Sequence, residues 1–277
     1  MCNLITTPKN GFRLRSTLVD QAEPKASLSD GAGSLVVERS RWHSLSVKRK
    51  PKHTNIWDVF HISPLGPNYP KATMSYSQFT TIDQVISAFD ITVIDRPNLF
   101  AEIKPIPASN KLRESLDETL DLASSISTEK ARSELIITPI LLEVRRIFKG
   151  QISYFSGTTF DVDASVGLNG ICDFMLSASD RQSLITAPVL AIVEAKDNDL
   201  RLGLGQCAAE MIAAHRFNTQ HSQGNRPIYG AISTGTNWRF LRLDQQELFI
   251  DRTEYFVLQL DQILGILCEA FQPMSMS

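Results

Sequence analysis

The chain has 277 residues, of which 43% are hydrophobic and 21% charged, and its formal net charge is −2. These values are normal for a soluble globular protein, and the length allows one large domain or two small ones. Because no run approaches 18 apolar residues and no secretory leader pattern is present, we expect no membrane-spanning helix. The four cysteines lack paired spacing, which argues against a zinc ribbon or a disulfide framework and favours a cytoplasmic protein with reduced thiols.

Charge divides the chain unevenly. Residues 1–73 carry 11 Lys and Arg against 5 Asp and Glu, a net charge of +6, so the remainder carries −8. The first stretch has no sustained periodicity and contains a basic cluster at 48–52 and a segment rich in Pro and Gly at 64–70. It therefore predicts a disordered basic extension, with a basic arm that binds nucleic acid phosphates as the alternative. Residues 74–277 are predicted to form a single domain.

Three helices are predicted ahead of the first long strand. A short helix begins at Thr81, and prolines between 97 and 107 then mark an irregular connection. A second helix is predicted at 111–126 and a longer third helix at about 128–148. Pro139 lies within the third helix and predicts a kink near its middle.

The pattern then changes to short strands separated by turns. Strands are predicted at 152–155, 159–163, 171–176, 187–195, 228–233, 238–243 and 248–250. The stretch 187–195 is largely apolar, which suits a central strand that is buried on both faces. Further helices are predicted at 200–218 and 256–271. This order predicts one α/β domain with a mixed sheet flanked by helices.

Polar residues gather on two of these strands. Asp173 lies on the strand at 171–176, and Glu194 and Lys196 lie at the end of the strand at 187–195. Side chains two residues apart on a strand share a face, so Glu194 and Lys196 project together while Ala195 points toward the apolar side. If the two strands pair, two carboxylates and one ammonium group meet at the strand ends. Such a group suits Mg²⁺ (Mn²⁺ is possible), with the backbone carbonyl of Ala195 as a candidate third ligand.

This arrangement favours phosphodiester hydrolysis over acyl or glycosyl transfer. A bound divalent cation lowers the pKa of water and stabilises negative charge on a phosphoryl oxygen. Lys196 would orient the attacking water or balance the charge at phosphorus, especially if burial lowers its pKa. Neither a GxSxG motif nor a phosphate-binding P-loop is present.

The series resembles the PD-(D/E)XK nuclease superfamily over about residues 128–243. Asp173 matches the family's motif aspartate, and the sequence at 194–196 matches its ExK motif. Cys172 stands where the family name has proline, which leaves the carboxylate in place. The resemblance implies a restriction-endonuclease-like core of helix, three strands, helix and strand, here with additional strands and a C-terminal helix.

Two further site residues follow from the resemblance. Gln206 is similar to the glutamine of RecB-like domains and of the N-terminal nuclease domains of type I restriction R subunits, and would position water or substrate. Glu134 is similar to the helix glutamate that many members add to the metal site, so it is a weaker candidate ligand beside Asp173 and Glu194. The implied activity is cleavage of nucleic acid, with DNA as the expected substrate.

Two alternatives remain open from the sequence. The acidic body is not the basic surface of a tight DNA binder, so the fold could be a catalytically inactive module that binds nucleic acid or a protein partner in a defence or repair assembly. Phosphate contacts would come from such a partner or from a local basic stripe, whose candidates are Lys111, Arg113, Arg145, Arg146 and Lys149. In the other alternative the ExK sequence is incidental and the chain is an unrelated α/β protein.

Overall fold

An eight-stranded mixed sheet forms the centre of the computed structural model, which describes residues 75–272. The predicted extension at 1–73 lies outside these residues. The strands are β1 (Thr92–Arg96), β2 (Ser153–Thr159), β3 (Ile171–Ser177), β4 (Val189–Ala195), β5 (Ile228–Ser233), β6 (Asn237–Asp244), β7 (Glu247–Asp251) and β8 (Tyr255–Phe256). Their order is β1-β7-β6-β5-β4-β3-β2, with β8 paired to β6. Pairs β1–β7 and β4–β5 are parallel and the others antiparallel, which confirms the α/β class with a mixed sheet.

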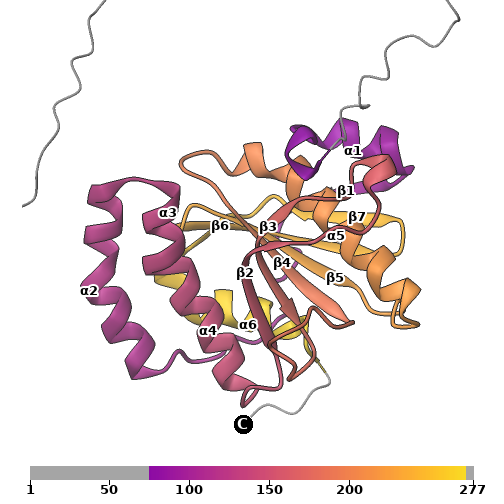
Figure 1. Ribbon diagram of the computed structural model, residues 1–277. Helices are drawn as coiled ribbons and strands as arrows, with labels where there is room; N and C mark the ends of the chain where they lie inside the picture. The colour runs from indigo at the N-terminus through magenta and orange to yellow at the C-terminus, as the bar shows by residue number, and fades with distance from the viewer. Residues whose placement is uncertain (1–74, 273–277) are drawn as a thin grey trace, which may run out of the picture. The chain divides into compact units, whose positions relative to one another are not determined.

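Helices flank the sheet on both sides. They are α1 (Ile82–Phe89), α2 (Asn110–Ile126), α3 (Glu129–Arg132), α4 (Thr138–Ile147), α5 (Leu204–Gln220) and α6 (Leu260–Glu269). Helix α5 packs on β4 and β5 and is contacted by α1, whereas α4 contacts β2 and α6. Figure 1 shows α1 and α5 on one side of the sheet and α2, α3, α4 and α6 on the other. Within residues 75–272, no helix combines the length and apolar composition that a membrane crossing requires.

The helix predicted at 128–148 contains a π-helical turn. The turn spans Ser133–Ile137 and joins α3 to α4 directly ahead of Pro139, where the sequence predicted a kink. Proline has no backbone N–H to donate to the Leu135 carbonyl, four residues earlier. The hydroxyl of Thr119 on α2 donates to that carbonyl instead, at 2.8 Å. The helix therefore continues past the proline with a widened turn, and a neighbouring helix supplies a donor.

The strand prediction was wrong in three places. The sequence predicted separate strands at 152–155 and 159–163, but β2 is one strand that pairs with β3 from Ser153 to Thr159. Gly157 adopts φ +59° within β2, a conformation that glycine tolerates, so the pairing continues through it. The prediction also missed β1, a five-residue strand that ends directly before Pro97 and pairs only with β7. The two-residue strand β8 was missed because it begins the segment predicted as a helix at 256–271.

Helix α5 holds the central strand β4 in place. Every residue of β4 is buried. At its first residue, the side chain of Asn218 accepts from the Val189 N–H at 2.8 Å and donates to the Val189 carbonyl at 2.7 Å. At the other end of α5, a Cβ on Gly205 would lie only 2.3 Å from the Phe79 carbonyl oxygen. This close approach brings the first turn of α5 against the backbone that leads into α1.

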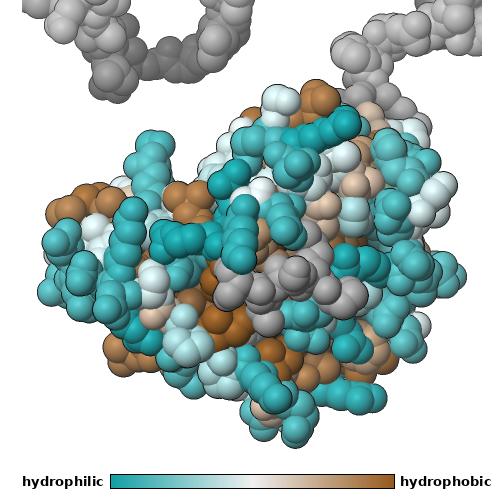
Figure 2. Space-filling model, turned by 90° about the horizontal axis from the view of Figure 1, so that it is seen from below, coloured by the Kyte–Doolittle hydropathy of each residue, from teal (hydrophilic) through white to brown (hydrophobic). Residues whose placement is uncertain are grey.

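One face of the molecule is mainly hydrophilic. Figure 2 shows polar side chains over most of this face, with smaller apolar areas between them.

The described cysteines lie in the interior, where Cys172, Cys207 and Cys268 are buried free thiols. Burial raises the pKa of all three thiols, so they stay protonated at neutral pH. These cysteines are packing groups in the core.

Candidate functional site

Asp173 and Glu194 are cross-strand neighbours on β3 and β4. The antiparallel register pairs Phe174 with Val193, which sets the preceding Asp173 opposite Glu194. Side chains that oppose each other in this way have Cβ atoms about 5 Å apart and share a face of the sheet. The backbone N–H of Ala195 donates to Asp173 Oδ2 at 2.9 Å. The structure therefore turns the Asp173 carboxylate toward the end of β4.

Glu194 is fully buried and contacts the ammonium group of Lys196. The Lys196 Nζ donates to Glu194 Oε1, and the other oxygen, Oε2, has no hydrogen-bond partner among the described residues. Burial and the nearby Asp173 raise the pKa of Glu194 to about 8, although Lys196 opposes the shift. Burial disfavours the Lys196 ammonium, but the Glu194 carboxylate outweighs this effect and raises the pKa of Lys196. Burial alone would lower the pKa of Lys196, the case that the sequence left open, but the lysine is buried together with a carboxylate.

Gln206 lies on the first turn of α5 and bonds to a second buried glutamate. Its Nε2 donates to Glu210 Oε1 at 3.2 Å, while Glu210 Oε2 has no partner among residues 75–272. Burial raises the pKa of Glu210 well above its usual value, and Glu194 adds to this shift. Glu210 is fully buried, which is rare for a glutamate without an ionic partner. Together, Glu194 and Glu210 place two unpartnered carboxylate oxygens in the interior beside α5.

Two helix acids lie close to this group, Glu129 and the predicted Glu134. Glu134 is exposed, and its carboxylate pairs with Lys130 at 2.6 Å. Glu129, one helical turn earlier, interacts electrostatically with Lys196 and Asp173. Burial raises the pKa of Glu129; Lys196 opposes this and Asp173 adds to it. The signal for Glu129 in the sequence is its position directly after the capping Thr128, whose Oγ1 accepts from the Ala131 N–H at 3.2 Å.

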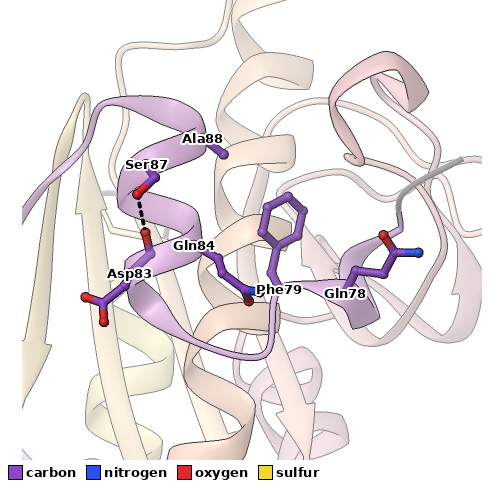
Figure 3. A pocket seen from close by; sticks show the side chains of 6 residues that line it. All are labelled: Gln78, Phe79, Asp83, Gln84, Ser87 and Ala88. Carbon is purple, nitrogen blue, oxygen red and sulfur yellow. Dashed lines mark hydrogen bonds between the residues drawn. The ribbon is translucent and has the colours of Figure 1, made fainter.

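A cavity of about 240 Å³ opens in front of Asp173. It lies between the start of the 129–138 helical segment and β2, where Gly157 carries no side chain. Both Glu129 and Glu134 line it, so the helix acid expected from the sequence lies at the same cavity as Asp173. A larger cavity of about 460 Å³ lies beside α1 (Figure 3), where the Ser87 hydroxyl donates to the Asp83 carbonyl at 2.8 Å. That second cavity contains none of the predicted site residues.

The donor set at the site fits a hard divalent cation. Asp173 and Glu194 offer carboxylate oxygens, which Mg²⁺ and Mn²⁺ prefer, and the buried Glu194 Oε2 lacks any other partner among the described residues. Two carboxylates suffice for an ion that keeps several waters. Within residues 75–272, no group of three or more His, Cys, Asp or Glu side chains has an arrangement that could hold a metal ion. The backbone carbonyl of Ala195 stays a predicted ligand.

The predicted basic stripe is partly neutralised by acids. Arg113 pairs with Asp261 at 2.5 Å, and Arg146 pairs with the buried Glu143. Because each guanidinium group already has a carboxylate partner, these two residues are poor candidates for phosphate contacts. The other three candidates of the stripe, Lys111, Arg145 and Lys149, stay predictions.

Comparison of the chain with models of protein families, with curated proteins and with solved structures gives no match.

Proposed function

We propose that residues 128–243 form a PD-(D/E)XK-type nuclease core that hydrolyses phosphodiester bonds of nucleic acid, with DNA as the expected substrate. The supporting observation is the 2.9 Å hydrogen bond from the Ala195 N–H to Asp173 Oδ2, which joins the motif aspartate to the ExK strand. The chain order of the 129–147 helical segment, β2, β3, β4, α5 and β5 supports the same proposal. It follows the helix, three strands, helix and strand of the restriction-endonuclease-like core.

Asp173 and Glu194 would hold the cation, with Glu129 or Glu134 as the additional helix acid. When bound, Mg²⁺ or Mn²⁺ lowers the pKa of water and stabilises charge on a phosphoryl oxygen. The Ala195 N–H fixes the orientation of the Asp173 carboxylate. Since the pKa of Lys196 is raised, its side chain stays an ammonium group near neutral pH. Lys196 therefore acts as a hydrogen-bond donor and a positive charge toward water or phosphate, not as a general base.

Gln206 contributes through its amide group. Its Nε2 donates to Glu210, which fixes the orientation of the side chain and leaves the amide oxygen as an acceptor. This oxygen would position water or substrate beside the two cation ligands. The fully buried Glu210 supports Gln206 from the interior of the protein.

A second candidate is the same fold without catalysis, as a module that binds nucleic acid or a protein partner. The contact between Lys196 Nζ and Glu194 Oε1 favours this candidate. Here the ammonium group balances the carboxylate charge without a metal ion. Calorimetric titration of the purified protein with MgCl₂ and MnCl₂ separates the candidates. Heat that disappears in Asp173→Asn and Glu194→Gln supports the nuclease, and the absence of heat in the wild type supports the inactive module.

Cleavage assays test the proposed activity directly. The purified full chain is incubated with fluorescent single- and double-stranded DNA, in Mg²⁺, in Mn²⁺ and in EDTA. We expect cation-dependent cleavage that falls about a hundredfold or more in Asp173→Asn and Lys196→Ala. Asp180→Asn removes an exposed carboxylate outside the site and should cleave like the wild type. Cleavage that survives both site substitutions, or no cleavage by the wild type, would reject the proposal.

A further inference from the structure

A third cavity, also of about 240 Å³, adjoins the end of β4 on the side away from β2. It lies where the end of α3 meets the loop after β4 and the turn between β5 and β6. A Cβ on Gly235 would lie 3.4 Å from the Arg132 Cβ, so this turn packs directly against the helix. The polar lining residues that matter here are Arg132, Asp197, Thr234, Thr236 and Asn237.

Arg132 is the cation of this cavity without a carboxylate partner among the described residues. Its Nη1 donates to the Thr234 carbonyl at 3.1 Å, while its buried Nε has no partner in residues 75–272. Two acids of the lining, Asp199 and Glu254, are already paired with Arg201 and Arg239, at 2.8 and 2.6 Å. The remaining acid, Asp197, is exposed to solvent, which screens its charge. Arg132 therefore leaves N–H donors for a ligand.

Neutral donors accompany the guanidinium group. The hydroxyls of Thr234 and Thr236 form a hydrogen bond with each other at 3.3 Å, which leaves the hydrogen of one of them for a ligand. The Asn237 amide also lines the cavity. An arginine with neighbouring hydroxyl and amide donors is the combination that binds phosphate oxygens. The lining offers no aromatic side chain on which a base could stack.

The cavity lies next to the proposed catalytic site. Glu129, which interacts with Asp173 and Lys196, is one helical turn before Arg132. The Lys196 N–H donates to the Ser233 carbonyl at 2.9 Å, which ties the ExK strand end to the turn that carries Thr234. A strand whose phosphodiester lies at Asp173 would therefore pass Arg132 with a neighbouring phosphate.

We propose that Arg132 binds a backbone phosphate next to the phosphodiester that is cleaved. This inference rests on the proposed function and assigns a substrate-binding residue to it. Arg132 is a binding residue for the strand, so its loss weakens affinity without removing the groups that perform the chemistry. The contact is to the sugar–phosphate backbone and is therefore independent of base sequence.

The test compares Arg132→Gln with Arg181→Gln, a matched change at an exposed arginine in the loop between β3 and β4. Binding of a fluorescent DNA oligonucleotide is measured by anisotropy in EDTA at several salt concentrations. We expect Arg132→Gln to raise Kd about tenfold and to reduce the salt dependence of binding by about one ion, whereas Arg181→Gln leaves both near the wild-type values. Arg132→Lys should recover the salt dependence but only part of the affinity.

Cleavage kinetics and urea unfolding complete the test. In Mg²⁺, Arg132→Gln should raise KM with kcat within about threefold of the wild type, because it removes binding alone. Unchanged urea unfolding shows that the effect is not structural. Equal Kd and equal salt dependence in Arg132→Gln and the wild type would overturn the inference even if cleavage is observed. A wild type that binds DNA but does not cleave it rejects the proposed function, and the Kd comparison then tests Arg132 only as a residue that binds the DNA backbone. A wild type that does not bind DNA rejects both.

Discussion

The buried carboxyl group of Glu210 allows a test of the site's electrostatics that needs no substrate. Its side chain is fully buried and receives a hydrogen bond from Gln206 Nε2 at 3.2 Å. Glu210→Gln keeps the shape of the side chain and an oxygen that can accept this bond. The substitution therefore removes the ionisable group with little change in packing.

The expected effect depends on pH. Burial raises the pKa of Glu210, so the folded protein keeps a proton that the unfolded chain releases above about pH 4.5. In that range the folded state binds more protons than the unfolded state, and wild-type stability falls as pH rises. The loss is about 1.4 kcal/mol per pH unit while Glu210 stays protonated, or at most about 4 kcal/mol between pH 5 and pH 8. Glu210→Gln should lose the share of this dependence that comes from Glu210, while Glu194 keeps its own, so the stability of the variant relative to the wild type should increase with pH.

Urea unfolding at pH 5, 6, 7 and 8 measures the difference. EDTA is present throughout, because a bound cation would change the charge of the site. Glu118→Gln on α2 makes the same substitution at an exposed carboxylate and serves as the control. If Glu210→Gln and the wild type show the same dependence of unfolding free energy on pH, Glu210 is ionised in the folded protein and the reasoning is refuted.

Two further predictions concern the contacts that hold the frame of the site. Gly205→Ala should lower the unfolding free energy by about 1–3 kcal/mol, because the new Cβ would lie 2.3 Å from the Phe79 carbonyl oxygen. An unchanged midpoint of urea unfolding would show that the contact between α5 and the backbone leading into α1 is loose. Thr119→Val should cost about 1–2 kcal/mol by removing the donor to the Leu135 carbonyl, and Thr119→Ser should restore most of it; equal losses in both variants would assign the effect to packing instead.

The sequence predicted the elements that have strong periodicity or a long apolar run. The run that ends at Ala195 gave the buried strand β4, and apolar spacing gave α2 and most of α5. The strand pairing that sets Asp173 beside Glu194 was predictable as a hairpin with a loop. The short strands β1 and β8 carry no such signal. Each is stabilised by pairing with another strand, β1 with β7 and β8 with β6, and this pairing leaves no periodic pattern in so few residues.

The helix at 128–148 was predicted with a kink at Pro139, and Glu134 matched the family's helix glutamate by its position. The role of Glu134 stays a prediction, because it lines the same cavity as Asp173 and Glu129. The π-helical turn and the Thr119 contact with Leu135 depend on tertiary neighbours, which periodicity does not contain. The direction of the pKa shift of Lys196 was also not predictable from the sequence. The pKa rises because the Glu194 carboxylate is buried beside the lysine, whereas the sequence indicates that the lysine is buried but not which group lies next to it.

The widened turn at Ser133–Ile137 makes the site sensitive to the length of the chain as well as to its side chains. A π-helical turn is an α-helix with one residue inserted, and each helical residue rotates the chain by about 100°. Loss of one residue there would straighten the segment and swing both Glu129 and Arg132 around the helix axis, out of their cavities. A homologue shortened by one position in this turn would retain every motif letter and still lack both side chains where a nucleic acid strand would pass.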